Sequence, residues 1–281
     1  MKTGIILPML LICCLIACGQ QQVATVSEDQ TNVNIMNQDS IQPKMKVEIW
    51  SDIMCPFCYI GKRNFEGALS QFADSANIEV EWKSFQLDPT IPQHFDKQVN
   101  VYQYLADRKG MSLDQSKAMH DRVVKMASDA GLQYNFDKAV VANSFNAHRM
   151  IQLAKTKGLG DAAEERLFLA YFTEGKNFGD AEVLEALGKD IGLTESDVRD
   201  ALSNENYAAK VKKDLAEADS IGVTGVPFFV FDRKFAVSGA QPSQAFLQAL
   251  NQSYGEWKKT QPAAVLKVEE GPSCTPQGKC D

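Results

Sequence analysis

The stretch KVEIWSDIMCPFCYIGKRNFE, residues 46–66, decides the fold because it joins a strand to a helix across two cysteines. The β-branched and aromatic residues of KVEIW predict a strand that ends near Asp52. Apolar residues at three- and four-residue intervals predict a helix over residues 64–76. Cys55 and Cys58 are therefore expected at the junction between the first strand and the first helix.

The rest of the chain continues this alternation. Residues 78–87, IEVEWKSFQL, alternate apolar and charged side chains and predict a second strand. From about residue 97 to residue 221 the periodicity is helical and predicts four to six helices. Residues 222–239 then predict a β-hairpin, and residues 242–257 predict a closing amphipathic helix. The expected order is β-α-β, a helical insertion, and β-β-α.

The first residues of the chain predict export. Lys2 is followed by an apolar run over residues 5–16, which is too short to span a bilayer comfortably. The segment ends in LIAC, residues 15–18, which resembles the lipobox of bacterial lipoproteins; an ordinary secretory signal is the alternative. We therefore expect cleavage before Cys18, a lipid on its sulfur, and a location in the bacterial cell envelope, facing the periplasm or the exterior.

Charge and cysteine usage narrow the partners. The 281 residues carry a net charge of −7, from 29 basic and 36 acidic residues, so we expect no binding to nucleic acid. Of the seven cysteines, processing removes Cys13 and Cys14 and lipidates Cys18. The other four stand as two close pairs in an oxidising compartment, which favours disulfide chemistry.

The position of the first pair assigns a role to each sulfur. Thiol–disulfide exchange runs through the thiolate, which the N–H groups and dipole of a first helical turn stabilise. Cys55 is expected at or just before the first helical residue, with Pro56 at the first position, where an N–H is not needed. Cys58 lies one turn further in and is expected to be more buried. Cys55 is then the nucleophile and Cys58 the resolving thiol.

A second signal lies in GVTGVPFFV, residues 222–230. Taken alone, Pro227 reads as an ordinary trans proline at the start of an edge strand, because only about one X–Pro bond in twenty is cis. A cis Val226–Pro227 bond would present the backbone of Val226 to an extended substrate.

Five segments together resemble the DsbA-like thiol–disulfide oxidoreductases, most closely their FrnE-like branch. They are SDIMCPFCYIGKRNFE, FQLDP, NSFNAHRMIQLAK, LFLAYFTEGKNFGD and GVTGVPFFVFDRKFAVSGAQP, spread over about residues 46–250. The resemblance implies an α/β thioredoxin-like fold with an inserted all-helical domain. It also implies that the protein forms or isomerises disulfides in exported proteins.

The same resemblance implies the site. Cys55 is the nucleophile, Cys58 the resolving thiol and Pro227 a cis-proline beside them. The residues expected to bind the substrate are Pro56, Phe57 and Val226. DsbA itself carries a histidine where this chain has Phe57, so its strongly oxidising potential is not carried over.

The expected domain boundaries follow from this fold. They are a lipoprotein-type signal peptide at 1–17, a flexible tether at 18–44, a thioredoxin-like domain at 45–96 and 222–260, a helical insertion at 97–221, and a tail at 261–281. We expect cysteine-containing substrate proteins, a redox recycling partner and the membrane as partners, with no cofactor and no metal. FrnE-like proteins commonly lack an export signal, so a cytoplasmic reducing role is not carried over.

The tail holds the second pair, Cys274 and Cys280, around a turn-prone loop with Pro276 and Gly278. One interpretation is a local disulfide staple. The other is an auxiliary disulfide that exchanges with the first pair, because exposed disulfides are the labile ones.

Three other functions compete with this interpretation. Both pairs together have the composition of a Cys₄ zinc site, although the spacing of the second pair is loose. The same architecture serves glutathione-dependent isomerases and kappa-class transferases, which have a serine at the position of Cys55 and lack the pair. A lipoprotein binder or holdase with a permanent structural disulfide is the non-enzymatic alternative.

Overall fold

The computed structural model describes residues 43–261. The elements of this part of the chain are β1 (Met45–Ser51), α1 (Pro56–Leu69), η1 (Ser75–Asn77), β2 (Ile78–Ser84), α2 (Val101–Lys109), α3 (Leu113–Asp129), α4 (Phe145–Thr156), α5 (Gly160–Leu169), η2 (Ala170–Glu174), α6 (Ala181–Asp190), α7 (Glu195–Ser203), α8 (Glu205–Ser220), β3 (Phe228–Phe231), β4 (Phe235–Ser238) and α9 (Ser243–Thr260). This order confirms the expected thioredoxin-like fold with a helical insertion between its strands.

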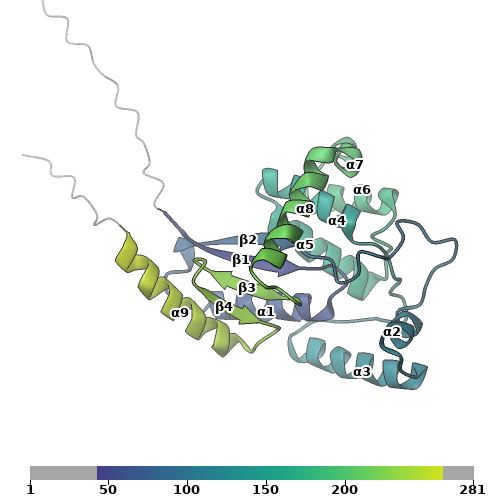
Figure 1. The fold of residues 1–281 in the computed structure, drawn as a ribbon, viewed down its shortest axis with the longest axis horizontal. Coiled ribbons are helices and arrows are strands. Elements are labelled where there is room, and N and C mark those ends of the chain that lie inside the picture. The colour runs from purple at the N-terminus through teal and green to yellow at the C-terminus, as the bar shows by residue number, and fades with distance from the viewer. Residues whose placement is uncertain (1–42, 262–281) are drawn as a thin grey trace, which may run out of the picture. The chain divides into compact units, whose positions relative to one another are not determined.

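The four strands form one sheet in the order β2-β1-β3-β4 (Figure 1). β1 pairs in parallel with β2, where Ile49 lies opposite Trp82, and antiparallel with β3, where Trp50 lies opposite Phe228. Because β1 has a neighbour on each side and a layer on each face, nearly all of its side chains are buried. β1 is therefore the central element, and both of its ends are held in place.

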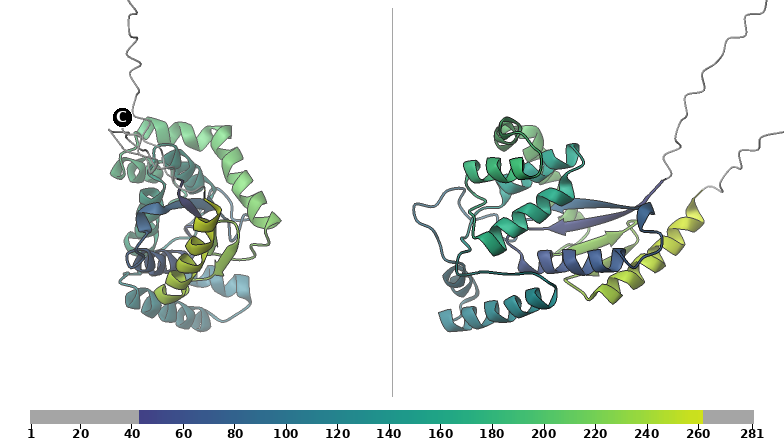
Figure 2. Two further views of the ribbon diagram at one scale, coloured as in Figure 1. Left: turned by 90° about the vertical axis from the view of Figure 1, so that its left-hand side faces the viewer. Right: turned by 180° about the vertical axis from the view of Figure 1, so that it is seen from behind.

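Helices cover both faces of the sheet. α1 and α9 lie side by side on one face (Figures 1 and 2). Phe65 of α1 packs against Phe229 of β3, with 5.5 Å between ring centroids, and against Phe246 of α9 at 5.8 Å. On the other face, Trp50 packs with Ala218 of α8. Alternate side chains of the strands thus enter two different cores.

The insertion between β2 and β3 contains seven α-helices, α2 to α8, rather than the expected four to six. One additional helix boundary lies at Asn204, within a stretch where the helical spacing of apolar residues is nearly continuous. Asn204 has an extended backbone (φ −78°, ψ 118°) that ends α7, and its side chain accepts a hydrogen bond from the N–H of Asn206 at the start of α8. A single N-cap therefore divides one periodic segment into two helices.

The core of the insertion is continuous with the first turn of α1. Cys55, Cys58, Tyr59 and Ile60 all pack in this core, whereas Phe65, one turn further along α1, belongs to the core of the sheet. The two cysteines therefore lie where the helical insertion meets the thioredoxin-like layers.

Several expectations concern other parts of the chain. The signal peptide, the tether with Cys18, and the tail with Cys274 and Cys280 lie outside the described residues. Within residues 43–261, no helix combines the length and the apolar character that crossing a bilayer requires.

Gly61 allows α1 to approach the loop that precedes β3. A Cβ at this position would lie 2.9 Å from Pro227 Cγ and 3.5 Å from Phe229 Cζ. Gly255 in α9 is a matched control, because a Cβ there meets nothing within 4 Å.

We predict that Gly61→Ala lowers the free energy of unfolding by about 1–3 kcal/mol, because the added methyl overpacks this contact. Gly255→Ala should raise it by about 0.5–1 kcal/mol, through helix propensity alone. Urea unfolding of both variants measures the difference. Equal stability of the two variants would contradict a tight approach at Gly61.

Candidate active site

Cys55 is the N-cap residue of α1, and Pro56 occupies the first helical position, as the sequence predicted. The backbone of Cys55 is extended (φ −83°, ψ 110°), and its N–H donates to the Asp52 carbonyl at 2.9 Å. The sulfur therefore lies at the positive end of a 14-residue helix, where N–H groups and the dipole stabilise a thiolate.

The loop before β3 faces this sulfur. The thiol of Cys55 donates to the Val226 carbonyl oxygen at 3.3 Å, and the Val226–Pro227 peptide bond is cis. The structure thus brings together Cys55, Val226 and Pro227, which the resemblance placed in one site. Both cysteines are free thiols.

Both sulfurs are more enclosed than the sequence indicated. Cys58 is the more buried of the two, as expected, with 1% of its surface exposed, but Cys55 is only 3% exposed. The reason is tertiary: the loop at Val226 and the helical insertion cover the junction from two sides. Cys55 still lines an open groove, which gives its sulfur a route to a partner.

Cys58 is held as a thiol. Burial raises its pKa well above the ordinary value, and the adjacent Cys55 sulfur raises it further. The Ser51 hydroxyl and the Asp52 backbone act in the opposite direction and limit the rise of the Cys58 pKa. Cys58 therefore needs a proton acceptor before it can attack another sulfur.

The groove beside Cys55 has a volume of about 540 Å³ and is mostly apolar. Its walls come from residues 54–57, from α2 and α3, and from the loop at Val226. Phe57 and Leu87, two of the few large apolar side chains on the described surface, lie at this groove with 38% and 40% of their surface exposed. Exposed apolar walls of this kind mark a binding surface.

Tyr134 fixes the first turn of α1 from the insertion, which the sequence did not predict. Its hydroxyl donates to the Pro56 carbonyl at 2.7 Å, and its ring stacks on Phe172 at 4.5 Å. Burial raises the pKa of Tyr134, so the hydroxyl stays protonated and remains a donor. A helix carbonyl between the two cysteines is thereby held at a set position.

Four polar side chains are buried behind the cysteines. They are Ser51, Asp52, His148 and Glu164, all completely buried. The Asp52 carboxylate accepts from the N–H of Leu87 at 2.7 Å and lies 3.8 Å from His148 Nε2. Burial opposes protonation of His148, but the Asp52 carboxylate outweighs it and raises the pKa of His148.

Glu164 is the member of this cluster that sequence reasoning missed. It lies on the buried face of α5 with Ala163, Leu167 and Phe168, so its place in the apolar i, i+3, i+4 pattern was the available signal. A carboxyl group on such a face is rare without a partner. Burial raises the pKa of Glu164 to about 7.

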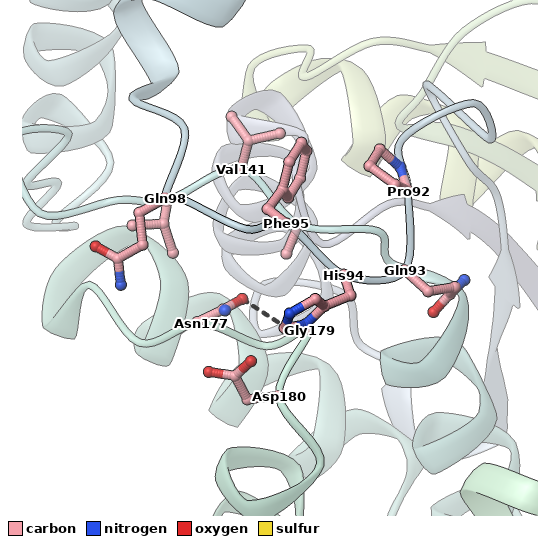
Figure 3. A pocket seen from close by; sticks show the side chains of 11 residues that line it. Pro92, Gln93, His94, Phe95, Gln98, Val141, Asn177, Gly179 and Asp180 are labelled. Atoms are coloured by element: carbon pink, nitrogen blue, oxygen red, sulfur yellow. Dashed lines mark hydrogen bonds between the residues drawn. The ribbon is translucent and has the colours of Figure 1, made fainter.

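A smaller cavity, of about 50 Å³, lies between the loop before α2 and the loop after η2 (Figure 3). His94, Asn177 and Asp180 lie around it, and Asn177 accepts a hydrogen bond from the N–H of Gly179 at 3.0 Å. No residue predicted for the exchange site lines this cavity. Across residues 43–261, no three His, Cys, Asp or Glu side chains are grouped as metal ligands.

We predict that the stability of Glu164→Gln, measured relative to the wild type, is greater at pH 8 than at pH 4. The unfolded carboxyl releases its proton near pH 4.5 and the folded one near pH 7, so wild-type stability falls as the pH rises through this interval. The variant lacks this loss, which amounts to about 3 kcal/mol. Urea unfolding at several pH values checks this; parallel pH profiles would contradict it.

Comparison with known proteins agrees with this geometry. A family model described as a DSBA-like thioredoxin domain matches residues 46–251. The crystal structure of the probable DsbA oxidoreductase SCO1869 from Streptomyces coelicolor is 38% identical, with a TM-score of 0.71, and the match covers 84% of this chain and 98% of that one.

Two more distant proteins are also similar. The uncharacterized protein YwbO of Bacillus subtilis is 28% identical over 210 residues, which is 73% of this chain and 95% of YwbO. The cytosolic disulfide reductase DsbM from Pseudomonas aeruginosa shares the fold, with 18% identity, a TM-score of 0.52, and coverage of 76% of this chain and 97% of DsbM. With its CxxC pair at the start of α1, this chain belongs to the family of DSBA-like thioredoxin domains and is a DsbA-like thiol–disulfide oxidoreductase.

Proposed function

We propose that this protein is an exported, FrnE-like enzyme that forms or isomerises disulfides in other exported proteins. The observation that carries the proposal is the placement of Cys55. Its sulfur lies at the N-terminus of α1, opposite the Val226 carbonyl and beside a groove. This arrangement supplies an activated sulfur, a backbone edge and a binding surface at one point.

The oxidation reaction assigns a role to each cysteine. In the oxidised enzyme, a substrate thiolate attacks the Cys55 sulfur; a substrate–Cys55 bond forms, the Cys55–Cys58 bond breaks, and Cys58 leaves and takes up a proton. A second thiolate of the same substrate then attacks the substrate sulfur that is bonded to Cys55 in this mixed disulfide. The substrate gains a disulfide, Cys55 leaves as a thiolate, and a recycling partner must accept the two electrons.

Isomerisation starts from the reduced pair. The Cys55 thiolate attacks a wrong disulfide, and a substrate thiolate later displaces Cys55 as the correct disulfide forms. If that displacement stalls, Cys58 attacks Cys55 and releases the substrate. The backbone of Val226 and the Cys55 sulfur serve both reactions.

The size and apolar character of the groove favour a protein substrate over a small-molecule substrate. Its apolar walls and a volume of about 540 Å³ accommodate several side chains of an extended segment. Phe57 lies at the groove and offers apolar contact where DsbA has a histidine. Unfolded proteins expose apolar segments next to their cysteines, so they are the matching substrates.

We further propose that the chain is anchored in the cell envelope through a lipid on Cys18. The support for this is the lipobox-like residues 15–18 after an apolar run. Two or three acyl chains, at about 0.8 kcal/mol per buried CH₂, make a firm anchor. An oxidising compartment then keeps the pair available as a disulfide.

We predict that Cys58→Ser accumulates a mixed disulfide through Cys55 when the reduced variant meets a disulfide-bonded peptide, because the resolving sulfur is missing. Cys55→Ser should form none and should reduce exchange to the uncatalysed rate. Intact-mass spectrometry under non-reducing conditions measures both. Equal trapping by the two variants would exclude the assigned roles.

We predict that cells fed a labelled fatty acid incorporate it into the wild-type protein and not into Cys18→Ala. The substitution removes the sulfur that would carry the diacylglyceryl group. Cys14→Ala is the control, since Cys14 lies in the segment to be cleaved. Labelling of Cys18→Ala at the wild-type level would reject the anchor.

A further inference from the structure

The groove beside Cys55 has a charge pattern that bears on its choice of substrate. No aspartate or glutamate lines it, although acidic residues outnumber basic ones in the whole chain, 36 to 29. The N-terminus of α1 forms part of its wall and contributes a positive potential. Its basic side chains are Arg108, Lys109 and His120. The walls are therefore mostly apolar, and every ionisable side chain of opposite sign to a carboxylate is on their side.

One face of α2 supplies both the apolar and the basic character. The residues of α2 that line the groove are Val101, Tyr104, Leu105, Arg108 and Lys109. Their spacing of three and four residues places them on a single face of the helix. The two cations lie in its last turn. α3 packs beside α2 and adds Met119, His120 and Val123 to the lining (Figures 1 and 2).

The three basic side chains differ in how far their charge is already balanced. Arg108 forms an ion pair with Asp88. His120 donates through Nδ1 to the Ser116 carbonyl at 2.8 Å, and burial lowers its pKa, so it is neutral at neutral pH. Lys109 is exposed and forms no ion pair within residues 43–261. Its positive charge is therefore the one that remains available to an occupant of the groove.

Tyr171 is a second available group. It lies on the short π-helix η2, and only 3% of its surface is exposed. Its side chain lines the groove, and its hydroxyl makes no hydrogen bond within residues 43–261. Burying a hydroxyl without a partner reduces stability, and short π-helices are frequent at functional sites. The hydroxyl is thus a donor that an occupant of the groove can satisfy.

The surroundings of Tyr171 determine which acceptor suits it. Burial raises the pKa of its hydroxyl, and the negative charge of Asp52 raises it further. The hydroxyl therefore stays protonated, and the same negative charge disfavours an anionic acceptor at this point. A neutral carbonyl group matches it, and each peptide unit of an extended segment carries one.

We propose that the groove selects substrate segments that carry an aspartate or a glutamate near the reacting cysteine. Lys109 binds the carboxylate of that side chain, and the Tyr171 hydroxyl donates to a backbone carbonyl of the same segment. This inference rests on the proposed function, because it names which cysteine-containing segments the groove accepts. Apolar side chains of the segment contact the remaining walls.

A basic side chain at the same place in the substrate meets the opposite effect. It finds no carboxylate on the walls of the groove, and both Lys109 and the N-terminus of α1 repel it. An uncharged side chain is neither attracted nor repelled by these charges. The groove should therefore rank otherwise identical segments in the order acidic, uncharged, basic.

The test uses single turnovers of the oxidised full-length protein with apolar dithiol peptides. Glutamate, glutamine or lysine is placed in turn at each of three positions on either side of the first peptide cysteine. A charge beside a cysteine also changes the reactivity of its thiol. Each second-order rate constant is therefore divided by that of the same peptide with 2-hydroxyethyl disulfide, so that the remaining differences between peptides report the groove.

We predict that, at the position with the largest effect, the wild type reacts about two- to five-fold faster with the glutamate peptide than with the glutamine peptide, and slowest with the lysine peptide. Lys109→Glu should reverse this order. Lys117→Glu is the matched control, because Lys117 lies on α3 outside the lining of the groove and its replacement makes the same change of net charge. This control should keep the wild-type order.

Tyr171→Phe tests the second contact by removing the hydroxyl alone. It should lower the rate constants with all three peptides by about two- to ten-fold relative to that with dithiothreitol, which corresponds to the loss of one neutral hydrogen bond. The order of the three peptides should not change. Dithiothreitol is the reference because it contains no peptide carbonyl.

Each outcome bears on one claim. Equal rates of the wild type with the three peptides, an unchanged order in Lys109→Glu, or a reversal in Lys117→Glu as well, overturns the selection by Lys109. An equal loss with dithiothreitol and with the peptides in Tyr171→Phe overturns the backbone contact, because a distorted site slows both reactions. Absence of reaction with every peptide, while dithiothreitol still reduces the Cys55–Cys58 disulfide, rejects the proposed function itself, independently of charge.

Discussion

The antiparallel pairing of β1 with β3 places Trp50 opposite Phe228, and it joins two loops that are far apart in the chain. One loop leads from β1 into α1 and carries Cys55; the other precedes β3 and carries Val226, 171 residues later. Because both loops leave the paired strands at the same end of the sheet, the thiol and the carbonyl meet at 3.3 Å. A shift of this register by one residue would turn every side chain of β3 to the opposite face and separate them.

The helical insertion makes the two sulfurs unequal. Cys55 lies between the positive end of α1 and an open, mostly apolar groove. Cys58 is in the same core as the aromatic side chains of the insertion, where burial raises its pKa. The two cysteines therefore differ in environment although they are only three residues apart, and such a difference is what an exchange reaction needs.

The insertion also contributes polar groups that a thioredoxin-like sheet alone would not hold. Tyr134 donates to the Pro56 carbonyl from one side, and α5 places Glu164 within 3.5 Å of Ser51 from the other. Burying these groups reduces stability unless their hydrogen bonds are satisfied, and Glu164 is only partly satisfied.

The sequence by itself determined the order of the elements and the position of the cysteine pair, because strand period, helix period and N-terminal proline are local signals. It also placed Pro227 beside the pair, through a family resemblance. Only the tertiary structure decided how enclosed Cys55 is and that Glu164 lies within 3.5 Å of the Ser51 hydroxyl. Those features depend on contacts between distant segments, such as the 113 residues between Ser51 and Glu164, and periodicity contains no record of which segments meet.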